Sequence, residues 1–325
     1  MIITKTPYRI SLFGGGTDYP EWYTKYGGEV ISTTIDKYIY ISVRELPPFF
    51  DHKHRIVYSK IENVKKTNQI KFDVIKKAIL HHAIKEGMEI HYDGDLPAKS
   101  GMGSSSSFTV GILNAFSSYR NKEISKKELA NKSIFFEQKI LKETVGIQDQ
   151  IAASYGGFNS VKFFRNGNFT VNPVIKNKSD LRTLNKNLFL VYTKIKRTAN
   201  YIAKTYVKKL TTEKKDSMDL ILGAVKECKA ILRKKNFDEI GPLLNKSWIA
   251  KKRLSNVVTN KFLNELYEYG IESGSTGGKI LGAGGGGFFL FYVPLKNQYK
   301  FKKKFKNKLI IPFNFSSEGS KVLLK

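Results

Sequence analysis

A glycine- and serine-rich segment at residues 97–107 constrains the fold most strongly. It lies between a predicted strand at 88–93 and an apolar helical pattern at 108–119. Glycines let the backbone approach a phosphate closely, and a helix start offers unpaired N–H groups at the positive end of the helix dipole. The segment therefore predicts an anion site. It lacks the Gly-Lys-Ser/Thr of the common P-loop, and a flexible loop with a serine cap explains the same residues.

Two further glycine-rich segments lie near the ends of the chain. In residues 279–288, Gly282, Gly284 and Gly287 fit G-x-G-x-x-G, but the following residues 288–293 have a strand pattern and not the helix that a dinucleotide site needs. We therefore exclude NAD binding and predict a hairpin that packs closely on a neighbouring loop or ligand. Near the N-terminus, a strand containing Arg9 ends in the turn at 14–16.

The order of predicted elements is mixed, which indicates an α+β fold. In the first part, strands are predicted at 1–13, 29–45, 88–93 and 158–174, and helices at 69–86, 108–119, 125–142 and 148–154. In the second part, strands are predicted at 187–193, 287–293 and 308–313, and helices at 198–211, 214–234, 236–248 and 260–270. We expect two lobes, residues 1–180 and 181–325.

Composition narrows the class of protein. A hydrophobic fraction of 41% supports a real core, and no run of 18 apolar residues occurs. Cys228 is the only cysteine, so an internal disulfide is excluded. The N-terminus lacks the pattern of a signal peptide. We expect a cytoplasmic protein with no membrane partner; the sequence leaves a homo-oligomer open.

The net charge of +28 favours two different classes of protein. It is typical of nucleic-acid binders, but 47 of the basic residues are Lys and only 9 are Arg. Specific nucleic-acid readers favour Arg for its bidentate geometry. We expect a solvated Lys-rich surface and no nucleic-acid partner, and we keep a basic nucleic-acid-binding protein as the distant alternative to an enzyme.

Four segments taken together resemble one family. They are Pro-x-Arg-Ile-x-Leu-x-Gly-Gly-x-Thr-Asp from Pro7, Pro-x-x-x-Gly-Met-Gly-Ser-Ser from Pro97, Gly-x-x-Asp-Gln from Gly146, and Lys-x-x-Gly-Ala-Gly-Gly-Gly-Gly-Phe from Lys279. In this order they resemble the GHMP kinases, the family of galactokinase and mevalonate kinase. The resemblance implies a two-lobed α+β fold with the active site between the lobes, and ATP-dependent phosphorylation of a small-molecule hydroxyl.

The resemblance also implies roles for individual residues. Asp149 matches the aspartate that accepts the proton of the attacking hydroxyl or orients it, and Arg9 the arginine that stabilises the transferring charge. The middle loop would bind ATP through Pro97, Lys99, Gly101, Met102, Gly103, Ser104, Ser105 and Ser106. Ser105 and Glu137 would hold Mg²⁺. A surface acid paired with Lys is the alternative for Glu137.

The sequence of residues 14–20 and 35–40 indicates which acceptor is phosphorylated. It differs from that of galactokinases and looks more like the bacterial kinases of D-glycero-D-manno-heptose 7-phosphate. Those enzymes phosphorylate the anomeric hydroxyl to the 1,7-bisphosphate, for nucleotide-activated heptose and surface polysaccharide. A fucokinase- or galactokinase-like sugar 1-kinase is the alternative.

A heptose phosphate would need two sets of contacts. The glycine segments would contact the acceptor through Gly15, Gly16, Thr17, Asp18, Gly284 and Gly285. Thr193, Lys194 and Arg197, at a predicted strand end that opens a helix, would bind the distal phosphate. The alternative for these three is a basic strand end that faces water.

Overall fold

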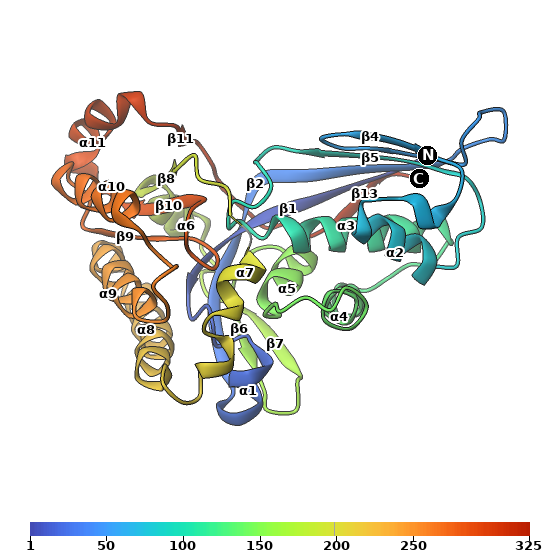
Figure 1. Ribbon diagram of the computed structural model, residues 1–325. Helices are drawn as coiled ribbons and strands as arrows, with labels where there is room; N and C mark the ends of the chain where they lie inside the picture. The colour runs from blue at the N-terminus through green and yellow to red at the C-terminus, as the bar shows by residue number, and fades with distance from the viewer. Residues whose placement is uncertain (198) are drawn as a thin grey trace.

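Two antiparallel-rich sheets and their covering helices make up the chain (Figure 1). The computed structural model describes residues 1–197 and 199–325. The first sheet has nine strands in the order β13-β1-β2-β5-β3-β4, with β12, β6 and β7 attached through β2. The second has four strands in the order β11-β8-β10-β9. This α+β arrangement is the predicted fold class.

The long strand β2 (Gly28–Glu45) is the spine of the first sheet. Its residues from Ile31 to Val43 pair with β1 (Ile2–Phe13), its second half with β5 (Met88–Gly94), and its first half with β6 (Phe158–Phe163). Residues rich in β-branched side chains suit such a pleated, two-sided surface. The glycine turn and α1 (Pro20–Tyr26) connect β1 to β2.

The first sheet also holds strands that the sequence analysis did not predict. They are β3 (His54–Val57), β4 (Ile61–Val64), β12 (Phe315–Ser316) and β13 (Lys321–Leu324); β7 (Phe169–Pro173) lies within the predicted 158–174 region. β13 pairs with β1 and β12 with β2, so the end of the chain returns to the first sheet. A boundary near residue 180, within α6 (Lys178–Lys186), stays a proposal.

Helix α3 (Ser104–Tyr119) packs on β1 and β2 and is buried along most of its length. It begins at Ser104, so the prediction of a loop through residue 107 is wrong. The cause is Gly103, whose φ of 73° ends the loop and caps the helix. Near α3 lie α2 (Asp73–His81), α4 (Lys126–Phe135), a π-helical turn (Phe136–Ile140) and α5 (Gln148–Tyr155). The predicted helix at 69–86 is shorter than expected.

The second sheet is formed by β8 (Leu188–Tyr192), β9 (Gly277–Ile280), β10 (Phe288–Tyr292) and β11 (Ile310–Ile311). Its helices are α7 (Ala199–Lys204), α8 (Lys215–Lys234), α9 (Ile240–Lys252), α10 (Lys261–Glu272) and α11 (Gln298–Lys304); α1 (Pro20–Tyr26) follows the first glycine turn. Short 3₁₀ turns span Thr67–Gln69, Val207–Lys209, Phe237–Glu239, Leu295–Asn297 and Phe305–Asn307. The predicted helix at 198–211 begins at a residue outside the described ones.

The pairing of β9 with β10 confirms the predicted hairpin and the exclusion of a dinucleotide motif, because the glycine segment between them opens a strand. The largest hydrophobic cluster joins both sheets, since Leu281 and Phe288 belong to it with residues of β1, β2 and α3. Among the described residues, no helix is both long enough and apolar enough to cross a bilayer.

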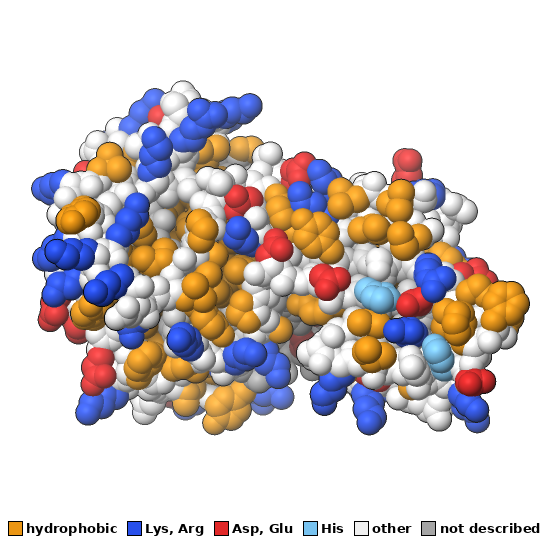
Figure 2. Space-filling view, turned by 90° about the horizontal axis from the view of Figure 1, so that it is seen from above, with side chains coloured by type: hydrophobic (Ala, Val, Ile, Leu, Met, Phe, Trp, Pro, Cys, Tyr) orange, Lys and Arg blue, Asp and Glu red, His pale blue; other side chains and the backbone are white. Residues whose placement is uncertain are grey.

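Basic side chains are dispersed over the surface in Figure 2, and are more numerous over the half that holds α8 to α11. They alternate with polar and apolar side chains on this face. The view agrees with a solvated Lys-rich surface on this side of the molecule.

Candidate active site

The three glycine-rich segments meet at a cavity of about 280 Å³. From β1 and the turn after it come Arg9, Ser11, Gly15, Gly16 and Asp18; from the loop and the start of α3 come Lys99, Gly101, Gly103, Ser104, Ser105 and Ser106; from the β9–β10 hairpin come Lys279, Gly282 and Ala283. Helices contribute Asp149, Asn200, Ser247 and Lys251, among others, and Tyr206 lies in the turn after α7. The cavity lies where the first sheet meets the helices and hairpin of the second.

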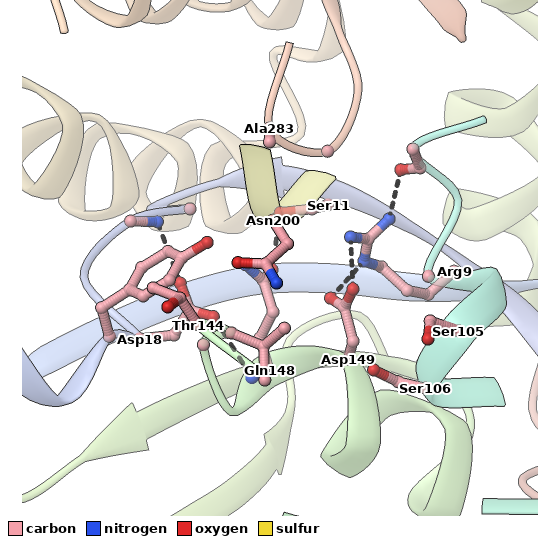
Figure 3. A pocket seen from close by; sticks show the side chains of 18 of the residues that line it. Arg9, Ser11, Asp18, Ser105, Ser106, Thr144, Gln148, Asp149, Asn200 and Ala283 are labelled. Carbon is pink, nitrogen blue, oxygen red and sulfur yellow. Dashed lines mark hydrogen bonds and ion pairs between the residues drawn. The ribbon is translucent and has the colours of Figure 1, made fainter. Parts of the chain in front are cut away.

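Arg9 and Asp149 form an ion pair on one side of the cavity (Figure 3). Arg9 Nε donates to Asp149 Oδ1 at 2.7 Å and Nη2 donates to Oδ2 at 2.8 Å, while Nη1 donates to the Gly101 carbonyl at 2.7 Å. Arg9 is buried on β1, whereas the carboxylate, in the first turn of α5, stays partly accessible from the cavity. The arginine therefore fixes both the carboxylate and the glycine loop beside it.

The glycine loop and the start of α3 present backbone amides to the same side of the cavity. No side chain caps the first turn of α3 among the residues described, so the amides of Ser104, Ser105 and Ser106 stay available. A Cβ on Gly103 would lie 3.1 Å from Arg9 Cγ, and a Cβ on Gly282 would lie 2.7 Å from the Gly101 Cα. Only glycines allow the loop to approach both Arg9 and the hairpin this closely.

Asp18 lies at the other end of the cavity, with Gln148 between it and Asp149 (Figure 3). It is 1% exposed; Gly16 N donates to its Oδ1 at 2.9 Å and Gln148 N to its Oδ2 at 3.3 Å. Burial raises the pKa of the Asp18 carboxyl, and these two backbone donors oppose that rise. A buried carboxyl with free acceptor capacity is suited to binding hydroxyls.

Glu137 lies behind the loop, in the π-helical turn, and is fully buried. Its Oε2 accepts from Ser106 Oγ at 2.9 Å and from Gln150 Nε2, whereas its Oε1 has no partner among the described residues. Burial raises the pKa of Glu137 to about 8. The side chain that contacts Glu137 is therefore that of Ser106 and not that of the predicted Ser105. Ser105, one residue earlier, is exposed.

These groups fit a magnesium ion. An orphaned buried carboxylate oxygen beside a serine hydroxyl supplies two hard oxygen donors, and Mg²⁺ takes its remaining ligands from phosphate oxygens and water. Among the described residues, no group of three His, Cys, Asp or Glu side chains that could hold a metal occurs.

Two buried lysines line the cavity, and neither was predicted from the sequence to have a role. Lys279 is the first residue of the third glycine motif, and this position in a motif could have indicated a role. Lys251, on α9, belongs to no motif, so nothing in the sequence indicated its role. Lys279 Nζ donates to the Leu12 carbonyl at 2.7 Å, and Lys251 Nζ donates to the Ile280 carbonyl at 2.9 Å and to the Gly282 carbonyl.

A third cationic side chain, that of Arg197, lines the cavity together with Lys251 and Lys279. It is 9% exposed, and its Nη2 donates to the Leu281 carbonyl at 3.3 Å. Burial lowers its pKa to about 10. Of the three residues predicted for a distal phosphate, only Arg197 lines the cavity: Thr193 Oγ1 donates to the Gly287 carbonyl and Lys194 is exposed.

Other predicted site residues lie outside the lining. Pro97 is half-buried behind the loop, and Met102 is buried and accepts the Arg9 amide at its carbonyl. Thr17 Oγ1 donates to the Gly14 carbonyl and so shapes the first turn. Gly284 and Gly285 pack against Val258.

Known proteins resemble this chain in sequence and in fold. Residues 70–157 match the GHMP kinases N terminal domain. The chain is 32% identical to the D-glycero-alpha-D-manno-heptose 7-phosphate kinase of Campylobacter jejuni, over 98% of each chain. A D-glycero-D-manno-heptose 1-phosphate kinase from Bacteroides thetaiotaomicron superposes with a TM-score of 0.80 at 25% identity, covering 100% of this chain and 99% of that one. A putative sugar kinase from Campylobacter jejuni gives 0.77 at 29% identity, covering 99% and 97%.

These likenesses define an enzyme that transfers a phosphoryl group to a small molecule. The chain belongs to the GHMP kinase family. The net charge left two classes of protein open, and this chain is an enzyme.

Proposed function

We propose that this kinase transfers the γ-phosphoryl group of ATP to the anomeric hydroxyl of D-glycero-D-manno-heptose 7-phosphate. The product would be the 1,7-bisphosphate, for nucleotide-activated heptose and surface polysaccharide. The observation that carries the proposal is the Arg9–Asp149 pair beside an anion-binding loop, in a cavity that also holds the buried Asp18. The 32% identity to a heptose 7-phosphate kinase supports the choice of acceptor.

In the proposed reaction, the anomeric oxygen attacks the γ-phosphorus while the bond to the β-phosphate oxygen breaks and ADP leaves. Asp149 accepts the hydroxyl proton or orients the hydroxyl for attack, since its carboxylate faces the cavity. Arg9, already held by both oxygens of Asp149, stabilises the charge on the transferring group.

The nucleotide would bind through the loop that includes Gly101, Gly103 and the amides of the first turn of α3. Mg²⁺, when bound, would neutralise phosphate charge, and Ser106 and Glu137 are the residues that would hold it. Ser105 then stays a candidate contact to phosphate oxygens, because it is exposed to the cavity.

The acceptor would occupy the end of the cavity near Asp18, whose carboxyl would accept hydrogen bonds from sugar hydroxyls. Arg197 would face the phosphate that the acceptor already carries. We also propose that the protein is cytoplasmic. Residues 1–180 would form an N-terminal domain with the ATP-binding loop and Asp149, and residues 181–325 a C-terminal domain with the closing glycine segment and substrate contacts.

The test is an ADP-release assay with Mg²⁺ against D-glycero-D-manno-heptose 7-phosphate, galactose and fucose. We expect turnover with the heptose phosphate at a kcat/KM at least about tenfold above that of either neutral sugar, as for one added charge-assisted contact. Turnover with fucose or galactose instead would favour a fucokinase- or galactokinase-like sugar 1-kinase. Absence of ADP release with all three would refute the proposed acceptor class.

A further inference from the structure

Lys251 and Lys279 are buried charges without an acidic partner. They are 9% and 4% exposed, and both line the cavity. Their hydrogen-bond acceptors are backbone carbonyls only, and within the described residues no carboxylate lies at ion-pair distance from either ammonium. Burying an unpaired charge is costly, so this arrangement is unusual unless a ligand completes it.

Both ammonium groups keep donors to spare. An ammonium carries three N–H donors, and Lys251 uses two while Lys279 uses one. The neighbouring Arg197 adds a buried Nε that has no partner among the described residues. Three cations therefore converge on this wall of the cavity with unsatisfied donors, which is what a phosphate dianion requires.

The pKa values of the two lysines reflect burial without an acidic partner. Burial lowers the pKa of Lys279 to about 7, and the pKa of Lys251 is lowered by burial and by its neighbours Lys279, Arg197 and Arg9. A bound anion would act in the opposite direction on both groups.

We infer that Lys251, Lys279 and Arg197 form a second anion subsite, which binds the phosphate monoester that the acceptor already carries. The subsite borders the nucleotide loop, since Arg197 N donates to the Lys99 carbonyl at 3.2 Å, but its lysines come from α9 and β9 whereas the loop has its own amides at the start of α3. This inference rests on the proposed function, since it assigns the acceptor's phosphate to named groups.

The alternative is that the lysines only anchor backbone. Lys251 holds the β9–β10 hairpin, and Lys279 ties β9 to β1 at Leu12. An anchor of this kind would affect all acceptors equally, whereas a phosphate subsite affects only phosphorylated ones. The ratio of the kcat/KM values for a phosphorylated and an unphosphorylated acceptor therefore separates the two alternatives.

The experiment measures kcat/KM of Lys251→Gln and Lys279→Gln for D-glycero-D-manno-heptose 7-phosphate and for the unphosphorylated heptose. The matched control is Lys214→Gln, which also removes a lysine that donates to a backbone carbonyl, that of Arg253, outside the cavity. We expect the preference for the phosphorylated acceptor to fall about tenfold to hundredfold in the first two variants and to stay unchanged in the control. An equal loss for both acceptors would overturn the inference.

A binding measurement keeps this inference distinct from the proposed acceptor. With the nucleotide site saturated by a non-hydrolysable ATP analogue, inorganic phosphate is expected to raise the melting temperature of the wild type and of Lys214→Gln, but not that of Lys251→Gln. If the wild type is inactive on sugars and this difference is present, the proposed function fails and the subsite stands. If phosphate stabilises all three proteins equally, the subsite is refuted.

Discussion

Gly146 permits the placement of Asp18, and its replacement by alanine tests that placement. A Cβ at Gly146 would lie 1.9 Å from Asp18 Oδ2 and 2.5 Å from Asp18 Cγ. Ordinary contact begins at about 3.4 Å, so the carboxyl must move by about 1.5 Å (3.4 minus 1.9). That shift is large enough to break the hydrogen bonds from Gly16 N and Gln148 N.

The magnitude follows from these contacts. Two hydrogen bonds of about 1 kcal/mol each, with overpacking of about 1–3 kcal/mol, lower the free energy of unfolding of Gly146→Ala by about 3–5 kcal/mol. If Asp18 binds the sugar, its displacement raises the acceptor KM by about tenfold or more, whereas the KM for ATP stays within about twofold of the wild type.

Initial rates of ADP release, with acceptor and ATP varied in turn, measure both constants, and urea unfolding measures stability. The control is Gly223→Ala: it lies within α8, no atom lies within 4 Å of its added Cβ, and a helix gains about 0.5–1 kcal/mol from the change. An acceptor KM in Gly146→Ala equal to that of Gly223→Ala would refute the role given to Asp18.

Three further predictions concern the reaction and the pH dependence of folding. Asp149→Asn is expected to lower kcat about 10²- to 10⁴-fold in the ADP-release assay, with ATP binding by fluorescence titration retained; a kcat within threefold of the wild type would contradict it. Ser106→Ala is expected to raise the Mg²⁺ concentration for half-maximal activity more than Ser105→Ala, because only Ser106 contacts Glu137; equal effects would argue against that pairing. Burial lowers the pKa of His54 to about 4, so the unfolded chain binds this proton first and stability is lost as pH falls from about 6.5 to about 4. Urea unfolding across this range is expected to show a shallower loss in His54→Gln than in the wild type, and parallel curves would refute it.

Local pattern predicted those parts of the fold that depend on neighbours in sequence. The strand after the third glycine segment followed from residues 288–293 alone, and α8 from apolar positions three and four apart, such as Met218, Ile221 and Val225. The start of α3 was misplaced because serines read as a loop in sequence, whereas Gly103 caps a helix at that point. The short strand β13 was missed because its pairing with β1 joins opposite ends of the chain.

The candidate site shows the same limit. Arg9 and Asp149 were singled out by a resemblance, but their contact spans 140 positions of the chain, and no local pattern determines it. The choice between Ser105 and Ser106 depends on where α3 begins, and the sequence pattern placed that start too late. Lys251 could not be found at all, because a single lysine on a lysine-rich helix resembles a solvated one until its burial is known.

Cationic side chains hold the three glycine segments around the cavity. Arg9, Lys251 and Lys279 each donate to a backbone carbonyl on or beside a different glycine segment. Carbonyls hold these side chains in place without neutralising them, and Asp149 is the one acidic partner of the three cations among the described residues. A site fixed by carboxylates would repel phosphate, whereas a site fixed by carbonyls has cationic donors left for the phosphate groups of the two proposed substrates.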